Sequence, residues 1–240
     1  MRYSRQILIK NFGEEGQKKL RKAKVAIVGV GGLGCAVSQY LTAAGIGELV
    51  LIDYQTVEIT NLNRQILYCE DDIGRLKVEV AKERLKCLNP EVEIKTYAEK
   101  LKEEFIKDVD VVVDCLDNFE GRYLLNEICV KNKIPFVHGA VENMHGQVTT
   151  IIPYETPCLR CIFNLKDRNE TLPILGFAAG TIGTIQAGEV IKLLSGVGET
   201  LKNKLLIINL ANNEFNLLNL KKNPKCSVCS KLCSNGDKDD

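Results

Sequence analysis

Short apolar runs alternate with amphipathic stretches through the first half of the chain. Apolar runs bounded by turn residues are typical of buried strands, whereas apolar positions that recur every three or four residues are typical of helices. The strand-like runs are residues 24–28, 48–53, 93–97, 109–115 and 135–138. The helix-like stretches are residues 14–22, 33–44, 76–88 and 120–132. This alternation predicts an α/β fold with a Rossmann-like, doubly wound and mostly parallel sheet.

The second half of the chain has a different pattern. It predicts a strand at residues 146–153, a helix at 178–194, and a hairpin formed by 204–210 and 214–220. We expect these late strands to extend the parallel sheet in antiparallel fashion. The helical spacing of four apolar residues predicts that they belong to the core: Phe177, Ile182, Ile185 and Ile191.

Composition and charge restrict the classes of function. The chain has 240 residues, of which 45% are hydrophobic, which is enough for one large core. Its net charge of +1 gives no field that favours nucleic acid or an anionic membrane. No leader pattern and no membrane-spanning apolar run is evident, so we expect a cytoplasmic protein in a reducing compartment. The short polar tail, residues 231–240, is expected to be disordered.

A glycine-rich turn separates the first predicted strand from the helix that follows it. Its residues are Gly29-Val30-Gly31-Gly32-Leu33-Gly34. Such a turn lets a phosphate approach the backbone and the N-terminus of the new helix. Asp53 ends the second strand, 21 residues after Gly32, where an acid suits the hydroxyl groups of a ribose. This pattern predicts a nucleotide site made by Gly29, Gly31, Gly32, Gly34 and Asp53, although a tight strand–helix turn alone is the simpler explanation for the glycines.

Polar residues further along the chain favour ATP over NAD. Arg64 and Lys77 are of the types that bind phosphates, and Asn61 precedes them in the same stretch. Asp117 and Asn118 follow an apolar run at the end of a predicted strand, where a carboxylate can hold Mg²⁺ against phosphate oxygens. A triphosphate with a departing pyrophosphate needs such a cluster. Each cation alone is better explained as part of a solvated face, and Asn118 is also a suitable helix N-cap.

Four of the ten cysteines form two Cys-x-x-Cys pairs, Cys158 with Cys161 and Cys226 with Cys229. Each pair can occupy two corners of a tetrahedral Zn²⁺ site. The 64 residues between the pairs predict that the metal ties the C-terminal segment to the body of the protein. Disulfides are the alternative, but a reducing compartment disfavours them. Cys233 has no assigned role, and the remaining cysteines are expected to be small buried residues: Cys35, Cys69, Cys87, Cys115 and Cys129.

The chain resembles the MoeB/ThiF/HesA group of ubiquitin-activating-enzyme-like adenylyltransferases. The motifs that carry the resemblance are RYSRQ, GVGGLG, LID, TNLNRQ, GRLK, DCLDN, HGAVENMHGQ, PCLRC and CSVC. The resemblance implies adenylation of the C-terminal glycine of a small ubiquitin-fold sulfur carrier that ends in Gly-Gly, for thiamin, molybdopterin or related sulfur transfer. It also implies a single domain over residues 1–230, with a nucleotide-binding half at about 1–140 and a carrier-docking and zinc half at about 141–230.

The resemblance assigns roles to individual residues. It implies that Gly32 meets the nucleotide, Asp53 binds the ribose, and Asp117 binds Mg²⁺ beside Asn118. Asn61, Arg64 and Lys77 match the phosphate-side groups, and the four cysteines match a structural zinc site. Arg5 matches an arginine that crosses to the partner's phosphates in a homodimer. Arg5, Arg64, Lys77 and Asp117 are thus the expected catalytic residues. None of them is expected to act as a nucleophile.

One departure from the family concerns sulfur transfer. Many relatives have a cysteine shortly after the first Cys-x-x-Cys pair, but residues 162–175 contain none, and Asn169 stands at about that position. We therefore expect a separate sulfur donor. His138 and His145 are expected to take no part in the chemistry. Two alternative functions remain at this point: activation of a carboxylate on RNA or on a small molecule, and an NAD-dependent oxidoreductase.

Overall fold

The computed structural model describes residues 2–166 and 172–230 and contains one eight-stranded sheet. The strand order is β3-β2-β1-β4-β5-β6-β7-β8. The strands are β1 (Lys24–Val28), β2 (Glu48–Ile52), β3 (Glu93–Tyr97), β4 (Val111–Asp114), β5 (Phe136–Glu142), β6 (His145–Ile151), β7 (Lys204–Asn209) and β8 (Glu214–Asn219). The predictions about the tail 231–240, Cys233 and Asn169 lie outside the described residues.

The sheet has a parallel part and an antiparallel part. Strands β1 to β5 pair in parallel, whereas β6, β7 and β8 are added in antiparallel order at the β5 edge. The predicted α/β fold with antiparallel C-terminal strands is thereby confirmed. The chain order reverses between β1 and β4, and open α/β sheets place their ligand crevice at the carboxyl ends of the strands at such a point.

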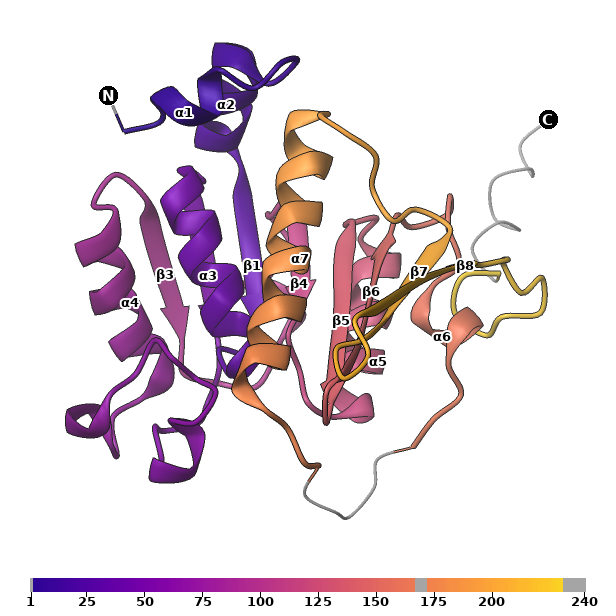
Figure 1. The fold of residues 1–240 in the computed structure, drawn as a ribbon. Coiled ribbons are helices and arrows are strands. Elements are labelled where there is room, and N and C mark those ends of the chain that lie inside the picture. Colours follow the sequence, from indigo (N-terminus) through magenta and orange to yellow (C-terminus); the bar gives the residue numbers. More distant parts are fainter. Residues whose placement is uncertain (1, 167–171, 231–240) are drawn as a thin grey trace.

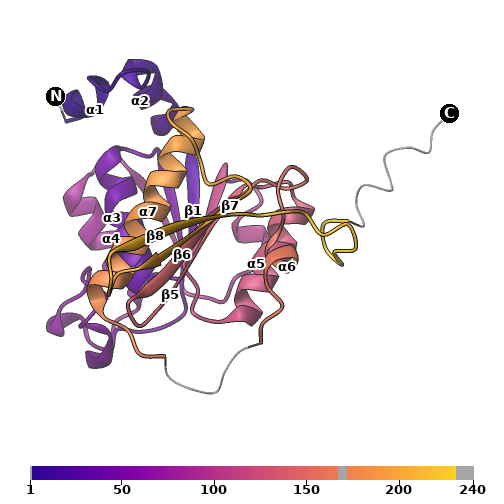
Figure 2. The same ribbon diagram turned by 45° about the vertical axis from the view of Figure 1, so that its right-hand side comes forward.

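Helices cover both faces of the sheet (Figures 1 and 2). Helices α3, α4 and α7 lie on one face, while α5 and α6 lie on the other. The helices are α1 (Ser4–Ile7), α2 (Gly13–Lys22), α3 (Gly32–Ala44), α4 (Lys77–Leu88), α5 (Phe119–Lys131), α6 (Leu159–Ile162) and α7 (Gly176–Ser195). Three short 3-10 helices lie in connections: η1 (Ile59–Asn61), η2 (Glu70–Asp72) and η3 (Glu103–Phe105).

The apolar runs form continuous strands because both of their faces are buried. In β1, Val25 and Ile27 pack into the core beneath α3, α4 and α7, whereas Ala26 and Val28 pack toward α5. Helices α3 and α7 approach very closely at Gly183, where an added Cβ would lie 2.5 Å from a backbone carbonyl oxygen. A larger residue there would force the two helices apart.

Two predictions about burial need correction. Phe177 is 54% exposed, although Ile182 is buried and Ile185 and Ile191 are partly buried against the core. Phe177 precedes Ile182 by five residues, which is about 140° around a helix, so the two side chains cannot share a face. The cysteine prediction is also wrong in part: Cys69 and Cys87 are exposed, whereas the other three cysteines of that set are buried.

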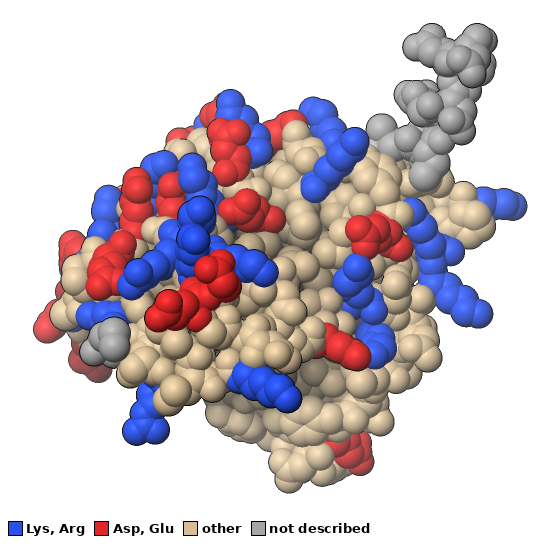
Figure 3. All heavy atoms as spheres, turned by 90° about the horizontal axis from the view of Figure 1, so that it is seen from above, with Lys and Arg blue, Asp and Glu red and all other residues tan. Residues whose placement is uncertain are grey.

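The surface carries charges of both signs. Seen from the end that bears α1 and α2, lysine and arginine alternate with aspartate and glutamate (Figure 3). Within residues 2–166 and 172–230, no helix combines the length and apolar character needed to cross a membrane.

Candidate functional site

The glycine turn between β1 and α3 is locked by close backbone contacts. Gly29 has φ +91°, and a Cβ on it would lie 2.7 Å from the carbonyl oxygen of Cys115. A Cβ on Gly34 would lie 2.1 Å from the Gly29 carbonyl oxygen, so only glycine fits either position. Helix α3 begins at Gly32. The N–H groups of its first turn therefore face the carboxyl edge of the sheet, as an anion-binding site requires.

Asp53 is fixed against this turn. Its carboxylate is 9% exposed and accepts hydrogen bonds from the backbone N–H of Val30 at 2.8 Å and of Gln55 at 2.9 Å. Each carboxylate oxygen has a second lone pair, which leaves acceptor capacity for ribose hydroxyl groups. The predicted ribose acid therefore lies at the glycine turn in a fixed orientation.

The segment from Asn61 to Tyr68 packs over the same turn. The Tyr68 hydroxyl donates to the carbonyl oxygen of Val30 at 2.8 Å, and Arg64 Cγ lies 3.5 Å from the point where a Cβ on Gly32 would sit. Asn61 is buried and accepts a hydrogen bond from the Glu58 N–H. The Arg64 guanidinium donates to the Thr60 carbonyl at 2.9 Å. Arg64 is therefore held beside the first residues of α3.

Lys77 begins α4 and is only 2% exposed. Its ammonium donates to Gln55 Oε1 at 2.7 Å. Burial lowers the pKa of Lys77 and the charge of Arg64 acts in the same direction, whereas the charges of Asp53 and Asp117 oppose the shift. Lys77, Asp53, Arg64 and Asp117 are thus close enough to interact electrostatically, whereas Arg5, the fifth ionic residue predicted for the site, is not among these charges.

Asp117 and Asn118 lie in the connection that leaves β4, the strand beside β1. Asn118 caps α5, because its Oδ1 accepts a hydrogen bond from the Gly121 N–H at 2.8 Å. Its Nδ2 donates to Asp117 Oδ1 at 3.1 Å. Asn118 can therefore cap the helix and serve the site at once, since it also holds the exposed Asp117 carboxylate at the carboxyl edge of the sheet. A carboxylate in such a position is suited to a Mg²⁺ ion that also binds phosphate.

Three residues around the turn were not assigned from the sequence: Gln55, Gln65 and Tyr68. Gln55 holds Lys77, Tyr68 holds Val30, and the buried Gln65 amide flanks Gly31. Gln65 ends the TNLNRQ motif, and its position in that motif was the only available signal.

His138 is wholly buried in a pair with Asp114. Burial lowers the pKa of His138, which keeps the imidazole neutral. Its Nδ1–H donates to Asp114 Oδ2 at 2.7 Å, and its Nε2 faces the Gln147 amide at 3.4 Å. The pair links β4 to β5 beneath the Asp117 loop. That the histidines take no part in the chemistry stays a prediction.

The four predicted zinc ligands converge. The Sγ atoms of Cys158, Cys161, Cys226 and Cys229 all lie within 4.8 Å of one another. Cys158 and Cys226 are 3.6 Å apart and Cys161 and Cys229 are 3.5 Å apart. Zn–S bonds of about 2.3 Å in a tetrahedron place the sulfur atoms about 3.8 Å apart, so the cluster fits a metal ion.

The surroundings of the cluster favour a thiolate at Cys226, whereas burial raises the pKa of the Cys158 thiol to about 11 and also raises that of Cys229. Burial acts to raise the pKa of Cys226, but the backbone N–H groups of Cys229 and Val228, together with the neighbouring thiols, lower it to about 7. The thiolate is the form that binds metals. The cluster joins the segment after β8 to α6, as the spacing of the two pairs predicts.

Arg5 lies far from the site on its own chain. It belongs to α1, at the opposite end of the sheet from the glycine turn (Figure 1). The neighbouring Tyr3 contacts Gly45 at the end of α3, where an added Cβ would meet the Tyr3 ring at 2.6 Å. Helix α3 has 13 residues and therefore spans about 20 Å from the turn to this contact. The structure does not bring Arg5 to the other site residues of its own chain.

Comparison with known proteins identifies the family to which this chain belongs. Residues 3–228 match the ThiF family. The chain belongs to this family. It is 42% identical over 238 residues to the SAMP-activating enzyme E1 of Haloferax volcanii, a match that covers 95% of this chain and 88% of that protein. It is also 42% identical over 240 residues to the adenylyltransferase and sulfurtransferase MOCS3 of Drosophila sechellia, of which the match spans 53%.

A solved structure of Escherichia coli MccB with ATP has the same fold. It has a TM-score of 0.86 and 29% identity to this ThiF-family chain, and the match covers 95% of this chain and 73% of MccB. The predicted family and enzyme class are confirmed: the protein is an adenylyltransferase of the MoeB/ThiF type that uses ATP. The NAD-dependent oxidoreductase is set aside.

Proposed function

We propose that this ThiF-family enzyme adenylates the C-terminal glycine of a small ubiquitin-fold sulfur-carrier protein that ends in Gly-Gly. The observation that carries the proposal is the gathering of Asp53, Arg64, Lys77 and Asp117 around one glycine turn in a chain of this family. The activated carrier then receives sulfur as a thiocarboxylate in thiamin, molybdopterin or related pathways.

The chemistry requires charge neutralisation and alignment. The carrier's terminal carboxylate is already ionised at neutral pH, so its attack on the α-phosphorus of ATP needs no general base. Repulsion between the two anions opposes the attack. Lys77 and Arg64 reduce that repulsion, and the first turn of α3 holds the phosphates in place. Pyrophosphate leaves, and AMP remains on the terminal glycine.

Asp117 would hold Mg²⁺ at this site. Its exposed carboxylate, fixed by Asn118, suits an ion that binds one or two carboxylates plus phosphate oxygens. When bound, Mg²⁺ supplies positive charge that offsets the charge of the phosphates. The four-cysteine cluster would hold a structural Zn²⁺, because its four thiols are the donor set of closed zinc sites.

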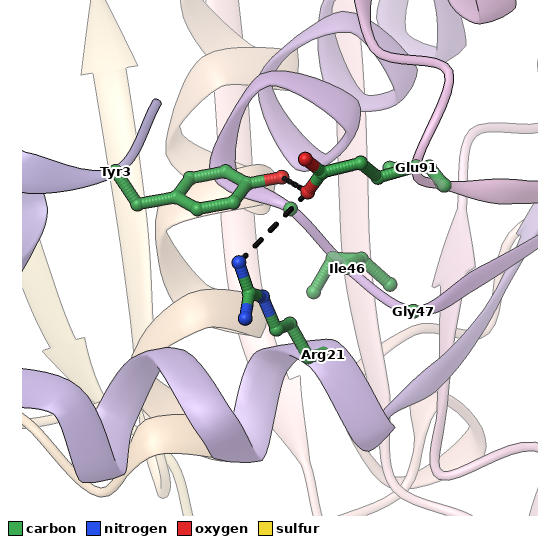
Figure 4. Close-up of a pocket in the computed structure, with 7 residues that line it drawn as sticks. Tyr3, Arg21, Ile46, Gly47 and Glu91 are labelled. Carbon is green, nitrogen blue, oxygen red and sulfur yellow. Dashed lines mark hydrogen bonds and ion pairs between the residues drawn. The ribbon is translucent and has the colours of Figure 1, made fainter. Parts of the chain in front are cut away.

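The N-terminal arm supports a shared active site. Tyr3 is buried and its hydroxyl donates to Glu91 at 3.0 Å, while Arg21 also pairs with Glu91 (Figure 4). Gln6 donates to the carbonyl oxygen of Ala44 at 3.1 Å. The arm is thus anchored on both sides of the exposed Arg5, which belongs to α1 at the opposite end of the sheet from its own nucleotide site. Arg5 would therefore complete the site of a partner copy.

An apolar groove on the helical face offers an interface for that copy. It encloses about 560 Å³ and lies between α3 and α7. Its lining includes Tyr40, Ile66 and Leu88, which are 54%, 68% and 42% exposed. Contiguous exposed apolar surface of this kind marks interaction sites. A second copy packed here would bury it and form a homodimer.

Mixing two inactive variants tests the shared site. Arg5→Ala and Asp117→Ala dimers should each be inactive, and subunit exchange should restore about a quarter of wild-type exchange activity. Half of the mixed population is then heterodimer, in which one site combines an intact Asp117 with the partner's Arg5. Arg64→Ala mixed with Asp117→Ala is the matched control and should stay inactive, because both residues serve the same chain's site. No recovery in the first mixture would place Arg5 outside the partner's site.

Strand β8 offers a docking surface for the body of the carrier. All six of its residues are exposed, and Phe215 and Leu217 are each 57% exposed. An edge strand with exposed apolar side chains is a surface that proteins usually protect or use for binding. The sulfur itself would come from a separate donor, since residues 162–175 contain no cysteine.

The direct product test is the mass of the carrier. After incubation with MgATP, a carrier ending in Gly-Gly should gain one adenylyl group, and a carrier without its last glycine should not. An unmodified carrier together with ATP consumption that depends on RNA would instead favour activation of an RNA-borne carboxylate.

A further inference from the structure

Lys77 is a buried cation whose hydrogen-bond partner is an uncharged side chain. It is only 2% exposed, and its ammonium donates to Gln55 Oε1 at 2.7 Å. Among the described residues, Gln55 is the one hydrogen-bond acceptor that this ammonium contacts. Buried charges are usually paired with an opposite charge. A neutral partner instead orients the ammonium without neutralising it by direct contact.

Backbone hydrogen bonds place Gln55 beside Lys77. The carbonyl oxygen of Gln55 accepts the backbone N–H of Lys77 at 3.0 Å. The adjacent residues Thr56 and Leu76 form an antiparallel bridge, which continues the same contact. The backbone N–H of Gln55 also donates to the carboxylate of Asp53 at 2.9 Å. One residue therefore fixes the predicted ribose acid through its backbone and the predicted phosphate-side lysine through its side chain.

A lysine side chain needs such a contact if its ammonium is to stay at a defined point. Its four-carbon stem is flexible, and its ammonium carries three N–H donors. The hydrogen bond to Gln55 uses one donor, which leaves two for phosphate oxygens. Gln55 itself is exposed, so the core does not require its side chain for packing.

We propose that Gln55 is a positioning residue, whose Oε1 holds the Lys77 ammonium in the orientation in which it meets the phosphates of ATP. This inference rests on the proposed function only in that Lys77 binds those phosphates. An ammonium that is already oriented loses less conformational freedom when the nucleotide binds. Gln55 itself contacts no phosphate, so its whole contribution acts through Lys77.

A double-mutant cycle tests whether Gln55 acts through Lys77. Gln55→Met keeps the length of the side chain and the backbone bond to Asp53 but removes the acceptor, and it should weaken ATP binding about tenfold by calorimetry. In a Lys77→Met background the same change should weaken ATP binding by no more than about twofold, because the group that Gln55 orients is already gone. The affinity of Gln55→Met for adenosine, which has no phosphate, should stay within about twofold of wild type.

Thr56→Ala is the matched control. Thr56 is the next residue, is likewise exposed and takes part in the bridge to Leu76. Its substitution should leave ATP affinity unchanged. Three results would overturn the proposal: wild-type ATP affinity in Gln55→Met, an equal loss for adenosine, or a tenfold loss that persists in the Lys77→Met background. If the wild type adenylates no carrier, the proposed function fails, whereas the binding cycle needs only ATP and still decides the role of Gln55.

Discussion

Replacing Asp117 with alanine is expected to lower carrier-dependent ATP–pyrophosphate exchange by about 100-fold or more. Asp117 is the one site carboxylate that faces solvent at the carboxyl edge, because Asp53 is bound to the backbone N–H groups of Val30 and Gln55. In the proposed site, Asp117→Ala would remove the protein ligand of the Mg²⁺ ion. The loss should appear mainly as a fall in kcat, since the glycine turn and Asp53 still bind the nucleotide.

Asp108→Ala is the matched control for this prediction. Asp108 is another exposed aspartate, located in the connection before β4, outside the nucleotide site. Its substitution should leave exchange unchanged. Exchange at the wild-type rate in Asp117→Ala would remove Asp117 from the catalytic residues and would require another ligand for the ion.

Loss of the proposed zinc ion from the four-cysteine cluster is expected to have the largest effect on stability. Structural zinc contributes several kcal/mol to folding, and a chain of this length loses about 2–4 °C of melting temperature per kcal/mol. Cys226→Ser should therefore lower the melting temperature by about 10 °C or more and abolish the zinc found by elemental analysis. A zinc chelator should have the same effect on the wild type, whereas a reducing agent should have none.

Cys87→Ser is the control that distinguishes the loss of a metal ligand from the general effect of replacing a cysteine. Cys87 is a free, exposed thiol on α4, and its replacement should change neither the zinc content nor the melting temperature. An unchanged zinc content and melting temperature in Cys226→Ser would contradict the structural zinc site. A fall in the melting temperature of the wild type on reduction would favour disulfides.

The regular elements could be predicted because their patterns are long and their faces are buried. Continuous apolar runs marked β1, β2 and β4, since these strands lie between two helical layers. Helices α1 and α6 escaped prediction because four residues are too few to show a helical period. The extension of β5 to Glu142 was missed because Gly139 and Ala140 have low strand propensity. The tight turn from β5 into β6 depends on Asn143 at φ +57°.

The site residues could be predicted where their role requires both a particular residue type and a fixed spacing in the sequence. The glycine turn, Asp53 and the two cysteine pairs have spacings that follow from their roles. Gln65 lacks such a mark, because nothing in a loop sequence shows which residue packs against Gly31. Arg5 is the opposite case: its assignment depends on a second copy, and the structure of one chain shows only that Arg5 lies far from its own site.

The central claim is best tested by ATP–pyrophosphate exchange in the presence of Mg²⁺. Carriers ending in Gly-Gly would be compared with the same carriers lacking the last glycine. The account predicts exchange that requires the intact terminus, since a chain shortened by one residue holds its terminal carboxylate about 3.5 Å short of the α-phosphorus. Two results would contradict carrier adenylation. One is tight ATP binding without exchange in the presence of any carrier, and the other is an equal exchange rate with intact and truncated carriers.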